Sequence, residues 1–172
     1  MTAYPKPFAD LWAIERLPAL GPGSANESAR AALAAISVDM FPNVRNAEAA
    51  NACISGLWLY HDFLDESQTI SQDLPSWFGS YWHGIMHRRE PDASNSKYWF
   101  RRVPPNPVFE AMGPISEELG LTLPRTAWDP YRFVDLCESN RGAGTPQELL
   151  LRKVQLREMK ELFNCCFKLA TT

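Results

Sequence analysis

The chain has 172 residues, of which 45% are hydrophobic and 22% charged, and its formal net charge is −3 at pH 7. That length and composition exclude a disordered chain and predict one globular domain over residues 1–172. The negative charge argues against a general nucleic-acid binder and against a binder of anionic membranes, because both need a basic surface. The most apolar window, Ala47–Tyr60, is too short and too interrupted by polar residues to span a bilayer.

The cysteines and the first residues of the chain favour a soluble cytoplasmic protein. No cysteine pair has the two-residue gap of a zinc knuckle or a redox motif. The stretch Met1–Trp12 contains two prolines and no apolar core, so it is not expected to be a signal peptide. Free thiols fit the reducing cytosol.

The first half of the chain is expected to form an extended arm followed by two helices. The arm covers residues 1–23 and ends in a Gly-Pro-Gly turn. Ser24 and Glu27 have the spacing of a capping box, which predicts a helix from Ser24 to about Ser37. A longer helix is predicted over residues 46–71, because residues that would form one buried helix face recur there at spacings of three and four. The residues of that buried face are Ala50, Ile54, Leu57, His61 and Leu64.

Caps and prolines divide the second half into further helices. A residue that precedes proline is pushed out of helical geometry, so the helix capped by Ser76 should end before Pro91. The remaining helices are expected over residues 92–102, 107–112, 114–120, 129–140 and 145–169. No strand-like alternation and no internal repeat is visible. The sequence therefore predicts an all-α, single compact domain of about six short-to-medium helices with Pro-rich connections.

All three histidines fall between His61 and Arg102. His83 and His87 are four residues apart on a predicted helix, which places them on one face, about 5–6 Å apart at Cβ. Helical metal sites use this spacing, so His83, His87 and His61 form the alternative ligand set for a divalent metal. A zinc peptidase would need Glu where Gly84 stands, and no Glu-x-x-His motif of a di-iron bundle is present. A divalent metal is therefore possible but not favoured, and the sequence does not identify a cofactor.

Acidic and basic residues separate within the same stretch. The acidic part carries Asp62, Asp65, Glu66 and Asp73, and the basic part carries Arg88, Arg89, Lys97, Arg101 and Arg102. We expect the two parts to face each other through arginine–carboxylate pairs that fix geometry more than they add stability. Arginines left over from this pairing could hold the carboxylate or phosphate of a small ligand.

A signature lies within this stretch and extends upstream of it. It consists of Gly79-Ser80-Tyr81-Trp82-His83, His87-Arg88-Arg89-Glu90-Pro91-Asp92, Asn95 and Lys97-Tyr98-Trp99-Phe100-Arg101-Arg102, with Leu59–Ser67 and Ile70–Gln72 upstream. This pattern, which covers roughly a quarter of the chain, resembles a family of uncharacterised bacterial and fungal proteins. The resemblance implies no activity. It implies only that the polar residues concentrated in the signature form a site.

Two functions follow from these residues, and the sequence leaves both open. In the first, a small polar or anionic metabolite binds between residues 46–71 and 76–102, and histidine acts in acid–base chemistry. Its expected catalytic residues are His83, His87 and Glu90, and its expected ligand-binding residues are His61, Asp65, Arg88, Arg89, Asn95 and Arg101.

In the second, the protein is structural or an interaction protein, and the same residues form a buried ion-pair network. The last predicted helix would offer an apolar edge for a homodimer, formed by Leu149, Leu156, Phe163 and Phe167. Neither reading includes nucleic acid or a membrane as a partner.

Overall fold

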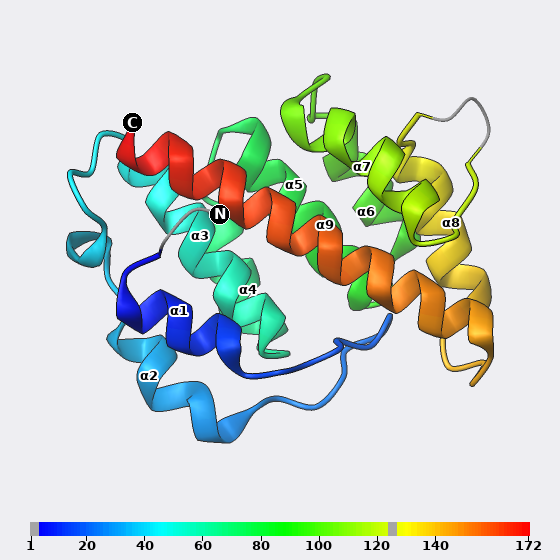
Figure 1. Cartoon of the computed structure of the whole chain (residues 1–172), viewed down its shortest axis with the longest axis horizontal. Helices are drawn as coiled ribbons and strands as arrows, with labels where there is room; N and C mark the ends of the chain where they lie inside the picture. Colours follow the sequence, from blue (N-terminus) through cyan, green and yellow to red (C-terminus); the bar gives the residue numbers. More distant parts are fainter. Residues whose placement is uncertain (1–3, 124–126) are drawn as a thin grey trace.

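The computed structural model describes residues 4–123 and 127–172, and all regular structure in them is helical (Figure 1). This confirms the all-α prediction, although the described residues form nine α-helices where about six were expected. Their bounds are α1 Lys6–Ala13, α2 Arg30–Ala35, α3 Ala47–Tyr60, α4 Leu64–Ser71, α5 Trp77–Arg89, α6 Ala93–Phe100, α7 Pro107–Glu118, α8 Pro130–Asn140 and α9 Pro146–Thr171. Short 3-10 turns, η1 Glu27–Ala29 and η2 Val38–Met40, flank α2. No helix in the described ranges is both long and apolar enough to cross a membrane.

Side-chain caps begin the helices that carry the signature. Ser76 Oγ accepts a hydrogen bond from the Gly79 N–H at 3.2 Å, and Asp92 Oδ1 accepts one from the Asn95 N–H at 3.0 Å. Ser76 was expected as a cap, and a helix start at residue 92 was expected as well, because a short polar side chain satisfies N–H groups that the first helical turn leaves free. These two caps fix where α5 and α6 start.

The prediction of one helix over residues 46–71 was wrong. Helix α3 ends at Tyr60. His61 is its C-cap, and Asp62 adopts a left-handed backbone conformation with φ +65°. Periodicity did not reveal the break, since Phe63 and Leu64 pack on the core just beyond it. Asp62 is held in this conformation by its ion pairs with Arg16 and Arg89.

Three other boundaries also differ from expectation. The arm contains α1, because Phe8 and Leu11 bury an apolar face there; residues 1–3 of the arm lie outside the described residues. The helix expected from Ser24 is shorter, comprising η1 and α2, and its first turn has no side-chain cap. The segments 107–112 and 114–120 merge into α7, which carries Pro114 in its interior.

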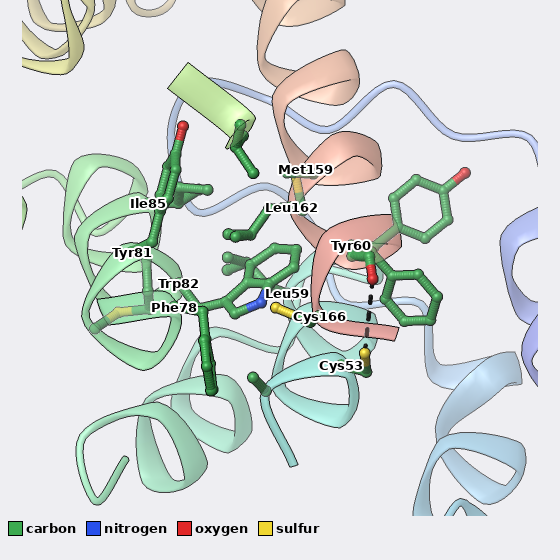
Figure 2. Close-up of a cluster of buried hydrophobic side chains, with 14 of the residues drawn as sticks. Cys53, Leu59, Tyr60, Phe78, Tyr81, Trp82, Ile85, Met159, Leu162 and Cys166 are labelled. Carbon is green, nitrogen blue, oxygen red and sulfur yellow. Dashed lines mark hydrogen bonds between the residues drawn. The ribbon is translucent and has the colours of Figure 1, made fainter. Parts of the chain in front are cut away.

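The core lies between α3, α5 and α9, and α9 runs across the whole molecule (Figure 1). Figure 2 shows Trp82 of α5 among apolar side chains of α3 and α9. Gly56 permits this packing, because a Cβ there would lie 2.4 Å from Trp82. Phe163 and Phe167 are buried in the same core, which corrects the predicted apolar dimer edge. Of that edge, Leu149 is 44% exposed.

Candidate functional site

Four side chains form a continuous row of hydrogen bonds from α4 through α5 to the turn after it. Ser71 Oγ lies 2.8 Å from His83 Nδ1, and His83 Nε2 lies 2.9 Å from His87 Nε2. The remaining nitrogen of His87, Nδ1, lies 2.6 Å from Glu90 Oε2. We call Ser71, His83, His87 and Glu90 the imidazole chain. It unites the three expected catalytic residues with one serine that sequence reasoning missed.

One arrangement of protons satisfies every atom of the imidazole chain. The Ser71 hydroxyl donates to His83 Nδ1, and the His83 Nε2–H donates to His87 Nε2. His87 Nδ1–H then donates to the Glu90 carboxylate. Each ring has one N–H and one lone pair, as a neutral imidazole requires. In this arrangement the two histidines are opposite tautomers, and the donors run outward from Ser71 to Glu90.

The imidazole chain leads from the interior to the surface. Ser71 is fully buried, His83 is 2% exposed and His87 is 5% exposed, whereas the side chain of Glu90 is 46% exposed. Burial, and to a smaller extent the neighbouring His87, lower the pKa of His83 to about 4. His83 is therefore neutral at pH 7, and positive charge is disfavoured at the inner end of the imidazole chain.

Helix α6 covers the imidazole chain with an amide and an indole. Asn95 Nδ2 lies 3.1 Å from His87 Nε2. The ring of Trp99 meets the ring of His83 edge-on, with centroids 4.2 Å apart. Asn95 was expected in the site, whereas Trp99 was not among the expected site residues.

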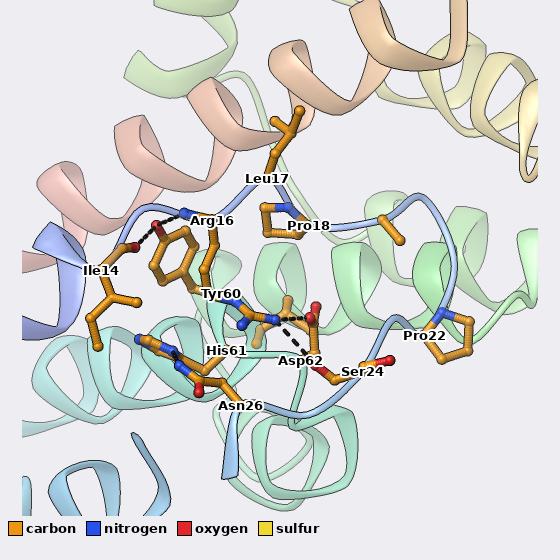
Figure 3. Close-up of polar contacts among 12 residues, drawn as sticks. Ile14, Arg16, Leu17, Pro18, Pro22, Ser24, Asn26, Tyr60, His61 and Asp62 are labelled. Carbon is orange, nitrogen blue, oxygen red and sulfur yellow. Dashed lines mark hydrogen bonds and ion pairs between the residues drawn. The ribbon is translucent and has the colours of Figure 1, made fainter. Parts of the chain in front are cut away.

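His61 was expected in the same site, but it lies apart from the imidazole chain, beside Asn26 (Figure 3). Its Nε2 lies 3.1 Å from the Leu11 carbonyl oxygen and its Nδ1 lies 3.0 Å from Asn26 Nδ2. Burial lowers the pKa of His61, so the neutral ring bridges two N-terminal segments. The predicted metal set of His61, His83 and His87 is therefore not assembled. Within residues 4–123 and 127–172, no group of three or more His, Cys, Asp or Glu side chains is placed to hold a metal.

Arg88 pairs with the last helix rather than with the acidic stretch. Its Nη2 lies 2.6 Å from Glu158 Oε2, and both side chains are fully buried. Tyr81 donates to Glu158 Oε1 at 3.1 Å, and the guanidinium lies 4.6 Å from the centre of the Phe133 ring. This group joins α5, α8 and α9. Nothing in the local sequence signalled Glu158, because it is 70 residues away from its partner.

Arg89 is the predicted partner of the acidic stretch. It forms an ion pair with Asp62. Asp62 also accepts a bond from Arg16, as Figure 3 shows. The other donors of Arg89 reach carbonyl oxygens of Ala19, Gly21, Pro22 and Leu59. A fully buried guanidinium with all its groups engaged is a structural clamp. We call Arg16, Asp62, Arg88, Arg89 and Glu158 the arginine network.

Three further polar side chains donate hydrogen bonds to backbone carbonyls of the N-terminal segment. Donors from α9 and the end of α8 bind carbonyls of residues 17–20, so each carbonyl from Leu17 to Pro22 accepts a side-chain bond. These donors are Arg141, Arg152 and Gln155. Sequence reasoning missed them, because their acceptors are backbone atoms that leave no pattern.

Asp65 and Arg101, the other two expected ligand contacts, are on the surface. Asp65 is exposed in the first turn of α4, and Arg101 is exposed just after α6, where its guanidinium lies 5.5 Å from the Tyr98 ring. Four clefts of about 330 to 520 Å³ are lined by residues outside the imidazole chain. The half-exposed Glu90 is the member of the imidazole chain that a ligand can reach from the surface.

Comparison with known proteins adds no assignment. Neither a protein-family model, nor a curated protein, nor a solved structure matches this chain. The resemblance to the bacterial and fungal family accordingly stays a prediction.

Proposed function

We propose that the imidazole chain is the acid–base centre of a small-ligand site at the junction of α5 and α6. The observation that carries this proposal is the row of bonds itself, which joins a buried hydroxyl to a half-exposed carboxylate through two imidazoles. Enzymes use imidazole–carboxylate pairs of this kind to accept and return protons.

In this proposal the roles follow from burial. Glu90 is the exposed end, so its carboxylate receives the proton of a bound ligand, such as that of a hydroxyl. His87 donates Nδ1–H to Glu90 and orients it, and the neutral ring of His83 holds the tautomer of His87. Because the pKa of His83 is lowered to about 4, the transferred proton stays on the Glu90 carboxyl group and does not move inward to His83. Asn95 contributes an amide to the ligand.

The alternative, a structural or interaction protein, is favoured by the arginine network. There every charged group meets a buried partner, and Arg88, Arg89 and His61 have donors committed to the fold. The imidazole chain differs, since its last member reaches solvent. We therefore divide the expected site residues: these three hold the fold, and the imidazole chain with Asn95 serves the ligand.

The proposal includes a reducing compartment and excludes nucleic acid as partner. Cys53, Cys137 and Cys166 are buried free thiols, which fits the cytoplasm. The aromatic run Tyr98-Trp99-Phe100 offers no continuous face on which bases could stack, because Phe100 is 1% exposed and Trp99 packs on His83. Dimer formation is not part of the proposal, because Phe163 and Phe167 of the expected edge are buried in the core.

A ligand screen with matched variants tests the proposal. Thermal shift of the full chain is measured against small hydroxy acids, amino acids and sugars, since a ligand of the native state raises its apparent stability. For each compound that stabilises the wild type, His87→Gln and Glu90→Gln should lose the shift, and Ser94→Ala, exposed on α6, should keep it. Equal shifts in all four proteins, or no shift with any compound at 10 mM (about the weakest affinity worth testing), would contradict the proposal.

A further inference from the structure

Arg102 lies in the turn that ends α6 and is held against an aromatic ring. Its guanidinium carbon is 4.9 Å from the centre of the Trp99 ring. Stacking uses the flat face of a guanidinium and leaves its in-plane N–H groups directed outward. Arg102 is exposed, and within residues 4–123 and 127–172 it has no carboxylate partner.

This separates Arg102 from the other arginines that lie on rings. Arg30 lies over Phe63 and Arg88 lies over Phe133, but their N–H groups are already bound to glutamates. Arg101 resembles Arg102, since it lies over Tyr98 and is unpaired within the described residues. The end of α6 therefore presents two oriented guanidiniums with free donors.

Trp99 links Arg102 to the imidazole chain. The indole contacts the guanidinium of Arg102 and also the ring of His83, 4.2 Å away between centroids. Residues three and four apart share a helix face, so Asn95, Trp99 and Arg102 form one stripe along α6. The stripe begins beside His87 and ends at a free guanidinium, about 10 Å further along the helix axis.

We propose that Arg102, assisted by Arg101, is the anchor for an oxyanion of the ligand, a phosphate or a carboxylate group. This inference rests on the proposed function and specifies its ligand class. The charges agree with the assignment, because the carboxylate of Glu90 lies at one end of the site and the guanidiniums lie at the other. A ligand with an oxyanion at Arg102 can direct its proton-donating group toward Glu90 without bringing two negative charges together.

Titration of the full chain with pyrophosphate and with citrate, at 150 mM NaCl, tests the anchor and separates the two sources of oxyanion. Binding is followed through the Nε–Hε signals of arginine in NMR spectra. We expect at least one of the two probes to shift the Arg102 signal in a saturable manner. Arg102→Gln should weaken that probe about tenfold or more, as expected when one charged, oriented donor is lost. Arg132→Gln, which removes an exposed arginine from α8, should leave binding unchanged.

Three results would overturn the anchor. Equal weakening by Arg102→Gln and Arg132→Gln would show a general effect of charge. An absence of saturable shifts with both probes would exclude an oxyanion site. A lower Tm for Arg102→Gln with unchanged binding would reduce the residue to a cation that stabilises a helix end.

The anchor and the acid–base proposal fail separately. His87→Gln removes the imidazole that orients Glu90 and leaves both guanidiniums in place, so pyrophosphate, which is outside the ligand screen, should still bind to it. Retained oxyanion binding by a protein whose ligand screen fails would keep the anchor and contradict the acid–base centre. The reverse pattern would keep the centre and contradict the anchor.

Discussion

The arginine network and the imidazole chain both include residues of α5, yet they place their charged groups differently. In the arginine network, Arg88 and Arg89 are fully buried and each faces a buried carboxylate, so charge is neutralised inside the protein. In the imidazole chain, the inner ring, that of His83, is neutral at pH 7, and the carboxylate of Glu90 is at the surface. The difference teaches that burial alone does not identify a functional residue. The two regions differ in their outermost polar group. In the arginine network this group, Arg16, is paired with a buried carboxylate, and in the imidazole chain it is the half-exposed carboxylate of Glu90.

The largest effect should come from breaking the arginine network. Arg88→Met leaves the fully buried Glu158 without its cation, and we expect a loss of about 3–5 kcal/mol in the free energy of unfolding. Urea denaturation measures this loss. The exposed Arg45→Met is the matched control and should change little. A loss below about 1 kcal/mol, the level of a surface ion pair, would mean that the arginine network does not hold the fold.

The pH dependence of stability should come from the imidazole chain. His83 has a pKa of about 4 in the folded protein, against an ordinary value of 6.5. The unfolded chain thus binds the proton first as the pH falls. The stability that neutral His83 contributes is complete above pH 6.5 and is lost as the pH falls from 6.5 toward 4. It amounts to about 3 kcal/mol.

Denaturation of wild type and His83→Gln at several pH values measures this contribution. The difference in the free energy of unfolding between them should change by about that amount across the window. His61, whose pKa is also lowered, adds a slope of the same sign that both proteins share. Parallel curves would show that His83 titrates normally and would remove the contrast between the two regions.

A smaller effect should follow from removing the charge at the break between α3 and α4. Asp62→Asn keeps a residue that tolerates the left-handed backbone but weakens the bonds to Arg16 and Arg89, and we expect a loss of about 2 kcal/mol. The exposed Asp73→Asn serves as control. Calorimetry of both variants decides, and equal Tm values for them would contradict the role given to Asp62.

The smallest effect should follow from Ser71→Ala. Removing the hydroxyl leaves His83 Nδ1 without its donor, which should cost about 1 kcal/mol. The same variant should raise the share of the other His83 tautomer in ¹⁵N NMR spectra, a readout that lost packing would not move. An unchanged tautomer ratio would end the role of Ser71 in the imidazole chain.

The sequence predicted the features that depend on residues close together in the chain. The caps at Ser76 and Asp92 and the pairing of His83 with His87 were visible, because each depends on residues three or four apart. The break at Asp62 was not visible, since apolar periodicity continues across it and its cause is a distant arginine.

The same distinction explains the site. His61 was grouped with the other histidines because it is near them in a helical reading of residues 46–71. The break after Tyr60 turns it toward Leu11 instead. Ser71 and Trp99 joined the site only through the packing of α4 and α6 on α5, which no spacing within one segment encodes.

The tautomers of His83 and His87 test the account most directly. Long-range ¹H–¹⁵N spectra of the full chain at pH 7 report which ring nitrogen carries the proton. The account predicts two neutral rings of opposite tautomer, with the proton on Nε2 of His83 and on Nδ1 of His87. A charged His83, or two rings of the same tautomer, would contradict the imidazole chain and with it the acid–base function.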